Sequence, residues 1–243
     1  MRSNNSRRVI LQIGLFLLFF LTVRGYAQRS KASALMDRYA ASLKTHKEYQ
    51  VTISYQIYKG SESTTPHDSV TGILYKSQGN TYSNMGEAEI ISTGSNYIKI
   101  NHKEKAMLLS QPLANANQYD INLVELYKYL DVSLLKETES FYRLEFKPKG
   151  LTQLPFSSLI IDLDKKTYLI KRQLFKYFSK MNFSKDYQNP DYDHYKLEIV
   201  YESYRMSNFS ISKKAFDVGS YIKDVKGKKV VGPKYKGYEL VKI

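Results

Sequence analysis

Apolar side chains occupy every second position in the segment Glu48 to Lys59. Tyr49, Val51, Ile53, Tyr55 and Ile57 alternate there with Gln50, Thr52, Ser54 and Gln56. Successive side chains of a β-strand point to opposite faces of a sheet, so a period of two predicts a strand with one apolar and one wet face. A sheet that must bury one of its faces is therefore the starting point for this fold.

Turn signals divide the chain after this segment into further strands. A Ser- and Thr-rich loop at 60–67 precedes a returning strand, Ser69 to Ser77, and Gln78-Gly79-Asn80 forms a tight turn. Regular spacing with such turns predicts an antiparallel meander. The other expected strands are Thr81–Asn84, Ala88–Ser92, Tyr97–His102, Ala106–Ser110, Phe141–Pro148, Ser157–Asp164, Tyr168–Ser179, Tyr192–Met206 and Gly237–Ile243.

Two segments have helical spacing. The first is Ser30 to about His46, where apolar residues recur at steps of three and four: Ala32, Leu35, Tyr39 and Leu43. A second helix is expected from Asp120 to about Leu130. A sheet of nine or more strands usually curls, and two short helices cannot seal it completely. The sequence predicts an α+β fold, a curved antiparallel sheet forming an unclosed half-barrel whose concave face the helices cover, with a hollow between them.

The first 27 residues differ in kind from the rest. Arg2, Arg7 and Arg8 precede a nearly continuous apolar run from Val9 to Val23, and small residues lie at the −3 and −1 positions of a cleavage site after Ala27. This layout is that of a secretory signal peptide. A membrane anchor is the alternative, but the run is shorter than the roughly 20 apolar residues of a spanning helix. We expect residues 28–243 to form a single exported domain, located in the periplasm.

The net charge and the cysteine content indicate which kinds of partner the protein could bind. Without the four arginines of the first 27 residues, the formal net charge falls from +14 to +10, and the chain has no Cys. From Lys213 onward nine lysines face three acidic residues. These lysines either form a solvated edge that discourages aggregation or attract anionic lipid headgroups or an acidic partner. No nucleic-acid-binding motif is present, so nucleic acid is not an expected partner.

The sequence shows no catalytic or metal-binding motif. None of His46, His67, His102 and His194 has a partner at zinc-ligand spacing, and the acidic loop before His194 lacks the Gly and Glu of an EF-hand. Ser-x-x-Lys occurs at Ser133 and again at Ser210, without the companion motifs of penicillin-binding enzymes. We expect neither an enzyme nor a cofactor.

Aromatic residues are abundant, with 22 Tyr and 11 Phe and no Trp. Strands favour aromatic residues, which accounts for most of the excess. A ligand hollow is the other reading, because Tyr offers an apolar body and a hydroxyl for the wet rim. Arg172 lies on the alternation of Tyr168, Ile170 and Leu174, which would point it into the apolar side, where it would need an acceptor. If Phe175 and Tyr177 face inward instead, Arg172 is solvated.

The chain from residue 30 to 243 resembles the LolA-type outer-membrane lipoprotein carriers, in the form found in Bacteroidetes. The resemblance is a pattern of elements, without a motif of fixed residues. It rests on Ala34 to Lys44 leading into Tyr49 to Tyr55, on Gly72 to Tyr82, on Ser158 to Asp164, and on the ending Phe216 to Tyr221 and Pro233 to Leu240.

This resemblance implies a LolA/LolB-like unclosed barrel that carries acyl chains of lipoproteins between membranes, without covalent chemistry. Inner- and outer-membrane lipoprotein-sorting proteins would then be partners. The carriers keep an arginine on an early strand that holds the lid shut, and Val51 to Tyr58 contains none. Control of the lid is therefore not carried over. Relatives of this fold also act as envelope sensors that bind another protein.

The leading hypothesis is a periplasmic carrier or binder of acyl chains, making transient contact with an anionic membrane surface. The alternative is an envelope sensor or scaffold that docks on a protein through its basic C-terminal region. The expected lining of the hollow is Ile53, Tyr55, Ile57, Leu74, Met107 and Leu109 from the sheet, Leu123 and Tyr127 from the second helix, and Arg172.

Overall fold

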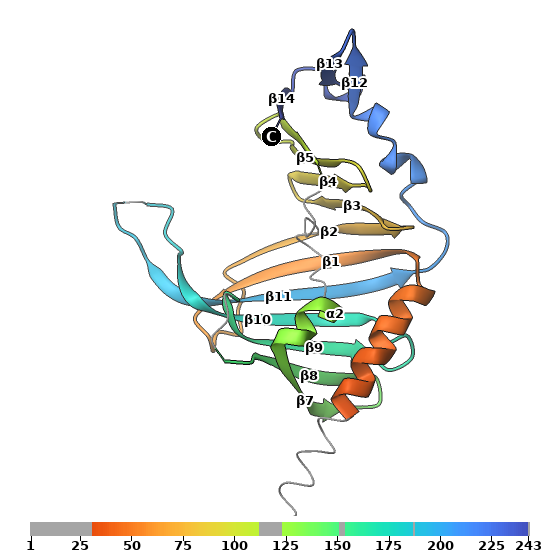
Figure 1. Ribbon diagram of the computed structural model, residues 1–243. Coiled ribbons are helices and arrows are strands. Elements are labelled where there is room, and N and C mark those ends of the chain that lie inside the picture. Colours follow the sequence, from red (N-terminus) through yellow and green to blue (C-terminus); the bar gives the residue numbers. More distant parts are fainter. Residues whose placement is uncertain (1–30, 112–122, 151–153, 187, 243) are drawn as a thin grey trace, which may run out of the picture.

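The computed structural model describes residues 31–111, 123–150, 154–186 and 188–242 (Figure 1). The expected signal segment and the first part of the second expected helix lie outside these residues. No helix within them is long and apolar enough to cross a membrane.

Within the described residues, twelve strands form one open sheet in the order β14-β6-β5-β4-β3-β2-β1-β11-β10-β9-β8-β7 (Figure 1). Its neighbours pair antiparallel except β14 and β6, which are parallel. The strands are β1 (Glu48–Lys59), β2 (Asp68–Ser77), β3 (Asn80–Met85), β4 (Ala88–Ser92), β5 (Tyr97–Asn101), β6 (Ala106–Ser110), β7 (Leu130–Glu137), β8 (Phe141–Pro148), β9 (Phe156–Asp164), β10 (Ile170–Asn182), β11 (Tyr192–Arg205) and β14 (Glu239–Lys242). A separate hairpin consists of β12 (Ile222–Val225) and β13 (Lys228–Val231).

Most expected strands are confirmed, those at Glu48–Lys59, Ala88–Ser92, Ala106–Ser110 and Phe141–Pro148 with identical bounds. The strand β7 was not predicted, and the second expected helix ends one residue before its expected end, Leu130. Its described part is α2 (Leu123–Leu126) and the 3₁₀ turn η1 (Tyr127–Tyr129), after which Leu130 opens β7. In β7, Leu130 and Val132 are buried on either side of the exposed Asp131, which is a period of two. The hairpin of β12 and β13 was not predicted either.

One helix, over residues 31–45, crosses one face of the sheet over β7–β11 (Figure 1). Its buried side chains Ala32, Leu35, Met36 and Tyr39 follow the expected steps of three and four. They pack on buried side chains from the strands beneath, together with Leu123 of α2. We call this the helix-side core; its sheet members are Tyr49, Val51, Ile53, Leu74, Met85, Leu130, Val132, Leu144, Phe146, Phe156, Leu159, Ile161, Leu163, Ile170, Phe175 and Ile199.

Hydrogen bonds attach this helix to the turn between β9 and β10. Arg38 Nη1 donates to the hydroxyl of Tyr168 at 2.6 Å, and Ser42 Oγ donates to the carbonyl oxygen of Thr167 at 2.6 Å. At the other end of the helix, Lys31 Nζ lies 2.5 Å from Glu137 Oε2. The helix is thus fixed at both ends to the strand turns that it crosses.

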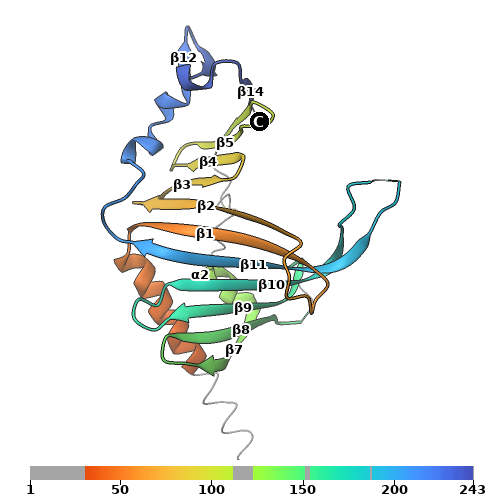
Figure 2. The ribbon, with the colours of Figure 1, turned by 180° about the vertical axis from the view of Figure 1, so that it is seen from behind.

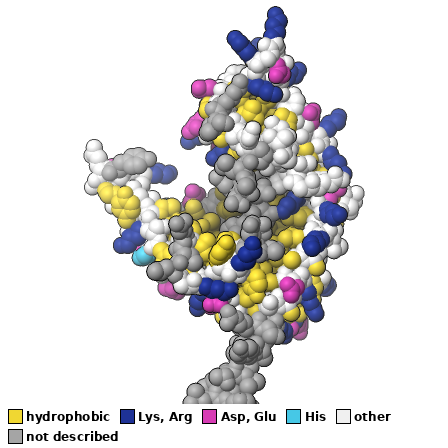
Figure 3. Space-filling model, viewed as in Figure 1, with side chains coloured by type: hydrophobic (Ala, Val, Ile, Leu, Met, Phe, Trp, Pro, Cys, Tyr) yellow, Lys and Arg dark blue, Asp and Glu magenta, His cyan; other side chains and the backbone are white. Residues whose placement is uncertain are grey.

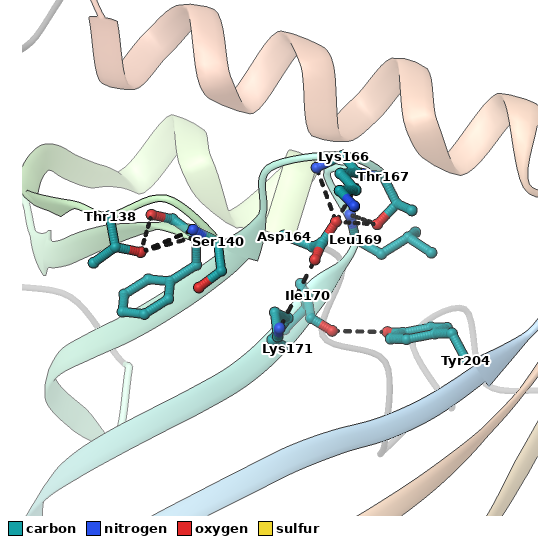
Figure 4. Close-up of polar contacts among 10 residues, drawn as sticks. Thr138, Ser140, Asp164, Lys166, Thr167, Leu169, Ile170, Lys171 and Tyr204 are labelled. Carbon is teal, nitrogen blue, oxygen red and sulfur yellow. Dashed lines mark hydrogen bonds and ion pairs between the residues drawn. The ribbon is translucent and has the colours of Figure 1, made fainter.

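The turn itself is organised by Asp164 (Figure 4). Its Oδ1 accepts hydrogen bonds from the backbone N–H groups of Lys166 and Thr167, both at 2.9 Å, and from the Thr167 hydroxyl. Burial raises the pKa of the Asp164 carboxyl, but these donors outweigh it and the pKa is lowered overall. A charged Asp164 therefore shapes the turn on which the helix rests.

A second core lies at the other end of the sheet, where the segment after β11 returns over β3–β6. Its 3₁₀ turns are η2 (Lys213–Phe216), η3 (Val218–Ser220) and η4 (Pro233–Tyr235). Tyr221, Ile222 and Tyr235 from this segment pack on sheet residues. We call this the C-terminal core; its sheet members are Ile91, Ile98, Ile100 and Met107.

The two cores lie on opposite faces of the same sheet. On β2, Leu74 belongs to the helix-side core, and the next residue, Tyr75, must point the other way. Tyr75 pairs with Tyr82, and Tyr82 pairs with Ile91 of the C-terminal core. Both Leu74 and Tyr75 are buried, at 2% and 0% exposure. The apolar side of the sheet thus changes face at β2, which is covered on both sides.

Candidate functional site

The structure divides the expected lining between the two cores. Ile53, Leu74 and Leu123 are buried in the helix-side core, and Tyr55 and Tyr127 pack against it half-buried. The remaining aliphatic residues do not join them. Met107 is fully buried in the C-terminal core and Leu109 packs against that core, while Ile57 is half-exposed near one end of β1.

Strand register explains why Met107 and Leu109 do not face Ile53. The residues paired across β2 to β6, starting from Leu74 of the helix-side core, are Ser83, Ile90, Lys99 and Leu108. Leu108 is thus the β6 residue on this face, and its neighbours at 107 and 109 point to the opposite side. The expectation that Met107 and Leu109 line one hollow with Ile53 is wrong.

Arg172 is also on the other face. Gln173 beside it pairs with Ile199 and is buried, whereas Arg172 pairs with Val200 on one side and Asp162 on the other. Its guanidinium binds Glu198 directly and lies 3.8 Å from Asp162. Of the two orientations that the sequence allowed, the structure has the one in which Phe175 faces inward. Arg172 therefore does not belong to the lining.

The face that carries Arg172 is polar over β8–β11, and no helix of the described residues covers it (Figure 2). Arg143 holds both carboxylate oxygens of Asp162 at 2.7 Å, and Tyr58 donates to Glu198 at 2.5 Å. Burial raises the pKa of Glu198, yet the bonds from Tyr58 and Arg172 lower it overall. Paired charges at bidentate geometry, such as Arg143 with Asp162, stabilise a wet sheet face.

A row of half-buried apolar side chains continues the helix-covered face toward the long arm formed by β10 and β11, which Figure 1 shows projecting from the sheet. Tyr55 and Ile57 lie two residues apart on β1, Ile57 pairs with Leu197, and Leu197 lies two residues from Tyr195. Tyr195 stacks on Tyr177 with ring centroids 4.4 Å apart. We call these five residues the apolar strip.

The sequence indicated this strip only in part. Alternation in the sequence puts Tyr195 and Leu197 on one face of their strand and groups Tyr177 with Phe175, but none of the three is among the expected lining residues. Burial, with a smaller contribution from Tyr195, raises the pKa of the Tyr177 hydroxyl to about 12. Tyr177 therefore stays neutral near neutral pH, and the strip carries no charge of its own.

The strip ends where the β1–β2 loop meets the arm. Lys59 binds Asp191 of the arm, and the His67 ring packs edge-on against Phe183 at 4.8 Å between centroids. Phe178 and Tyr192, also on the arm, are 61% exposed. Together these contacts fix the arm beside the strip and leave aromatic surface at its outer end.

A shallow pocket lies elsewhere, below the C-terminal end of the helix over residues 31–45. Its volume is about 240 Å³, and Leu43, His46, Lys47 and Tyr49 are among its lining residues. This is smaller than the roughly 300–1,000 Å³ typical of small-molecule sites. It shares no residue with the expected lining and no residue with the apolar strip.

The described residues show no arrangement for catalysis at the positions that the sequence raised. Ser133 and Lys136 lie on the strand β7, and Ser210 donates its hydroxyl to Gln50 Oε1 at 2.9 Å. Lys213 pairs with Glu48 at 3.3 Å. No group of three or more His, Asp or Glu among these residues could hold a metal ion.

No protein-family model matches this chain, and no curated protein matches it in sequence. Solved structures are similar to it in part. An uncharacterised conserved protein of Thermus thermophilus is 11% identical with a TM-score of 0.48, over 88% of this chain and 99% of that one. A putative outer-membrane lipoprotein-sorting domain of Vibrio parahaemolyticus is 11% identical with a TM-score of 0.40, over 78% and 97%.

A LolA superfamily protein of Nitrosomonas europaea is 11% identical with a TM-score of 0.35, over 76% of this chain and 96% of that one. At such scores the likeness is partial, and no residue role is transferred from these proteins. The expected Bacteroidetes form of the family stays a prediction.

Proposed function

We propose that this protein is exported and binds acyl chains on the apolar strip, as a non-catalytic carrier or binder. The observation that supports this proposal is the strip itself. Its five uncharged apolar side chains form a continuous surface on the helix-covered face and are half-buried, not fully buried. An acyl chain needs an elongated apolar surface and no hydrogen-bond partner along its length. The tyrosine rings of the strip supply part of that surface.

The first 27 residues support export, because their layout is that of a secretory signal peptide. An exported binder of acyl chains meets them in the periplasm on lipids and on lipoproteins. Lipoproteins are the cargo we propose, with inner- and outer-membrane sorting proteins as donor and acceptor.

Leu197→Asn tests this function at the centre of the strip. Leu197 is half-exposed, so the change should leave the fold intact, whereas Ile53 is only 1% exposed and its replacement would test the core. A polar amide in the acyl path should weaken binding of a fluorescent fatty acid by about tenfold, because the amide must be desolvated without a partner. Titration of the probe, with a thermal melt of each variant, measures both effects.

Leu135→Asn is the matched control. Leu135 is 50% exposed on the edge strand β7 and does not belong to the strip. This variant should bind the probe as the unchanged protein does. Equal binding by a folded Leu197→Asn protein, or no binding by the unchanged protein after delipidation, would refute the proposal.

A further inference from the structure

The hairpin of β12 and β13 projects from the end of the molecule opposite β7 (Figure 1). It is a two-stranded sheet of its own, joined by a tight turn in which Lys226 and Gly227 both have positive φ. Its base is anchored, since Ile222 is 5% exposed in the C-terminal core and Gly232 N–H donates to the Tyr221 carbonyl at 2.6 Å. The tip is therefore held out in solvent by a fixed base.

The two faces of this hairpin differ. Ile222 and Val231 pair on one face, followed toward the tip by Asp224 and Lys229, whose charges lie 3.9 Å apart. On that face the apolar pair lies at the anchored base, and the charges of the pair nearer the tip neutralise each other. The second face carries two pairs, Lys223 with Val230 and Val225 with Lys228.

The second face has no acidic residue, and all four of its side chains are exposed. Val225 is 50% and Val230 is 39% exposed, and they are diagonal neighbours across the two strands. Lys226 at the turn adds a further cation beside them. Figure 3 shows Lys and Arg side chains gathered at this end of the molecule.

Protection of a sheet edge would explain the lysines, because charged edge residues discourage strand pairing. Edge protection does not explain the two exposed valines between the lysines, because polar residues would serve that purpose better at these positions. Aliphatic side chains flanked by cations match the boundary of an anionic bilayer, where the valines enter the headgroup region and the lysines meet phosphates.

We propose that this face of the hairpin docks the protein on an anionic lipid membrane. The observations favour a membrane over an acidic protein, because four side chains are far fewer than the roughly 20–30 residues a side of a stable protein interface. Docking on a bilayer requires only a small amphiphilic tip on the protein, because the anionic lipids supply the field of negative charge. The inference stands independently of the apolar strip, which lies on the opposite face of the main sheet.

The absence of tryptophan makes a direct test available. Val225→Trp gives the protein a single indole at the hairpin tip, and Lys185→Trp places one at an exposed position on the β10–β11 arm. The protein purified after export is mixed with vesicles of phosphatidylcholine with or without 30% phosphatidylglycerol. Expected results are a blue shift of Val225→Trp emission and quenching by brominated lipids, only with the anionic vesicles. The emission of Lys185→Trp should not respond.

Charge variants test the lysines without removing the valines. Lys223→Gln/Lys228→Gln should weaken vesicle binding on the order of 20-fold at low salt, since each lysine near such a surface contributes about fivefold. Lys166→Gln/Lys185→Gln removes the same charge from exposed sites elsewhere and should change binding no more than about twofold. Leu197→Asn, which tests the acyl site, should keep full vesicle binding, so the two proposals fail separately.

Three results would overturn the inference. Equal loss in both double-lysine variants would mean that net charge alone acts. Equal binding to vesicles without phosphatidylglycerol would mean that the lysines are not used. A shift of Val225→Trp emission with soluble polyglutamate but no quenching by brominated lipids would assign the face to an acidic protein instead.

Discussion

The helix-side core is built mainly from aliphatic and phenylalanine side chains, whereas the C-terminal core places tyrosines around a buried carboxyl group. Glu89 on β4 is 2% exposed and accepts a hydrogen bond from Tyr235 at 3.2 Å. His102 Nε2 lies 3.2 Å from the same carboxyl group, and His102 Nδ1 lies 3.0 Å from the Tyr238 hydroxyl. Polar atoms thus fasten the C-terminal segment to its core, while the helix is fastened by groups at the rim of its core.

This difference shows how one sheet can serve two covers. The helix is positioned by the packing of its apolar side and by rim contacts to Tyr168, Thr167 and Glu137. A cover with buried polar partners is positioned from within, because each partner has a required direction. Burial raises the pKa of Tyr82 to about 12, with the charge of Glu89 adding to it, which keeps this hydroxyl neutral in the same cluster.

The strongest test of the comparison is Phe146→Ala in the helix-side core. Phe146 is fully buried, and its loss should lower the free energy of unfolding by about 3–5 kcal/mol. Because β2 is buried on both faces, we expect the C-terminal core to unfold in the same transition. Urea unfolding followed by hydrogen exchange at both ends of the sheet checks this. An unchanged midpoint at β4–β6 would show that the cores are separate cooperative units.

The corresponding test in the C-terminal core is Glu89→Ala. It leaves the Tyr235 hydroxyl without its acceptor and should cost about 1–3 kcal/mol. The loss should appear first as faster hydrogen exchange in residues 221–238, while the helix over residues 31–45 stays protected. Glu87→Ala, at an exposed turn position two residues earlier, is the control and should have little effect. Exchange that rises equally in the helix would contradict the assignment of Glu89 to one core.

Alternation in the sequence predicted most of the strands, although not β7, β12 and β13, and it did not predict how the strands pair. Alternation assigns residues to a face within one strand, as in Tyr195, Leu197 and Ile199, and the structure keeps these assignments. It does not say which face of the next strand continues that surface. Met107 and Leu109 were therefore joined to Ile53, although register places Leu108 on that face.

The apolar strip was missed for a related reason. Counting by twos groups Tyr177 with Phe175 on β10 and Tyr195 with Leu197 on β11, but it does not show that Tyr177 and Tyr195 meet across the two strands. The C-terminal hairpin was missed because its strands are four residues long and rich in lysine, which hides their alternation. These two sites are recognised only in the structure. The evidence is the stacking of the Tyr177 and Tyr195 rings for the strip, and the pairing of Val225 with Lys228 for the hairpin.

The smallest expected effect concerns the rim of the helix-side core. Hydrogen bonds from Lys165 and from Lys31 lower the pKa of Glu137 from 4.5 to about 2. A carboxyl group whose pKa is lowered in the folded state stabilises that state above pH 4.5, and this contribution is lost as the pH falls toward about 2. Glu137→Gln should therefore be less stable than the unchanged protein above pH 4.5, and the difference should vanish at the acid end. Urea midpoints across this range at low and high salt measure it.

Because the Glu137 side chain is 37% exposed, salt should shrink the difference. Glu139→Gln, at an exposed position in the same turn, should show no such pH dependence. If Glu137→Gln lowers stability by the same amount at every pH, the bond from Lys31 is not what holds the N-terminal end of the helix. The N-terminal end of the helix would then be held by the hydrogen bond from the Tyr127 hydroxyl to Ser33 Oγ and by the burial of Ala32 and Leu35.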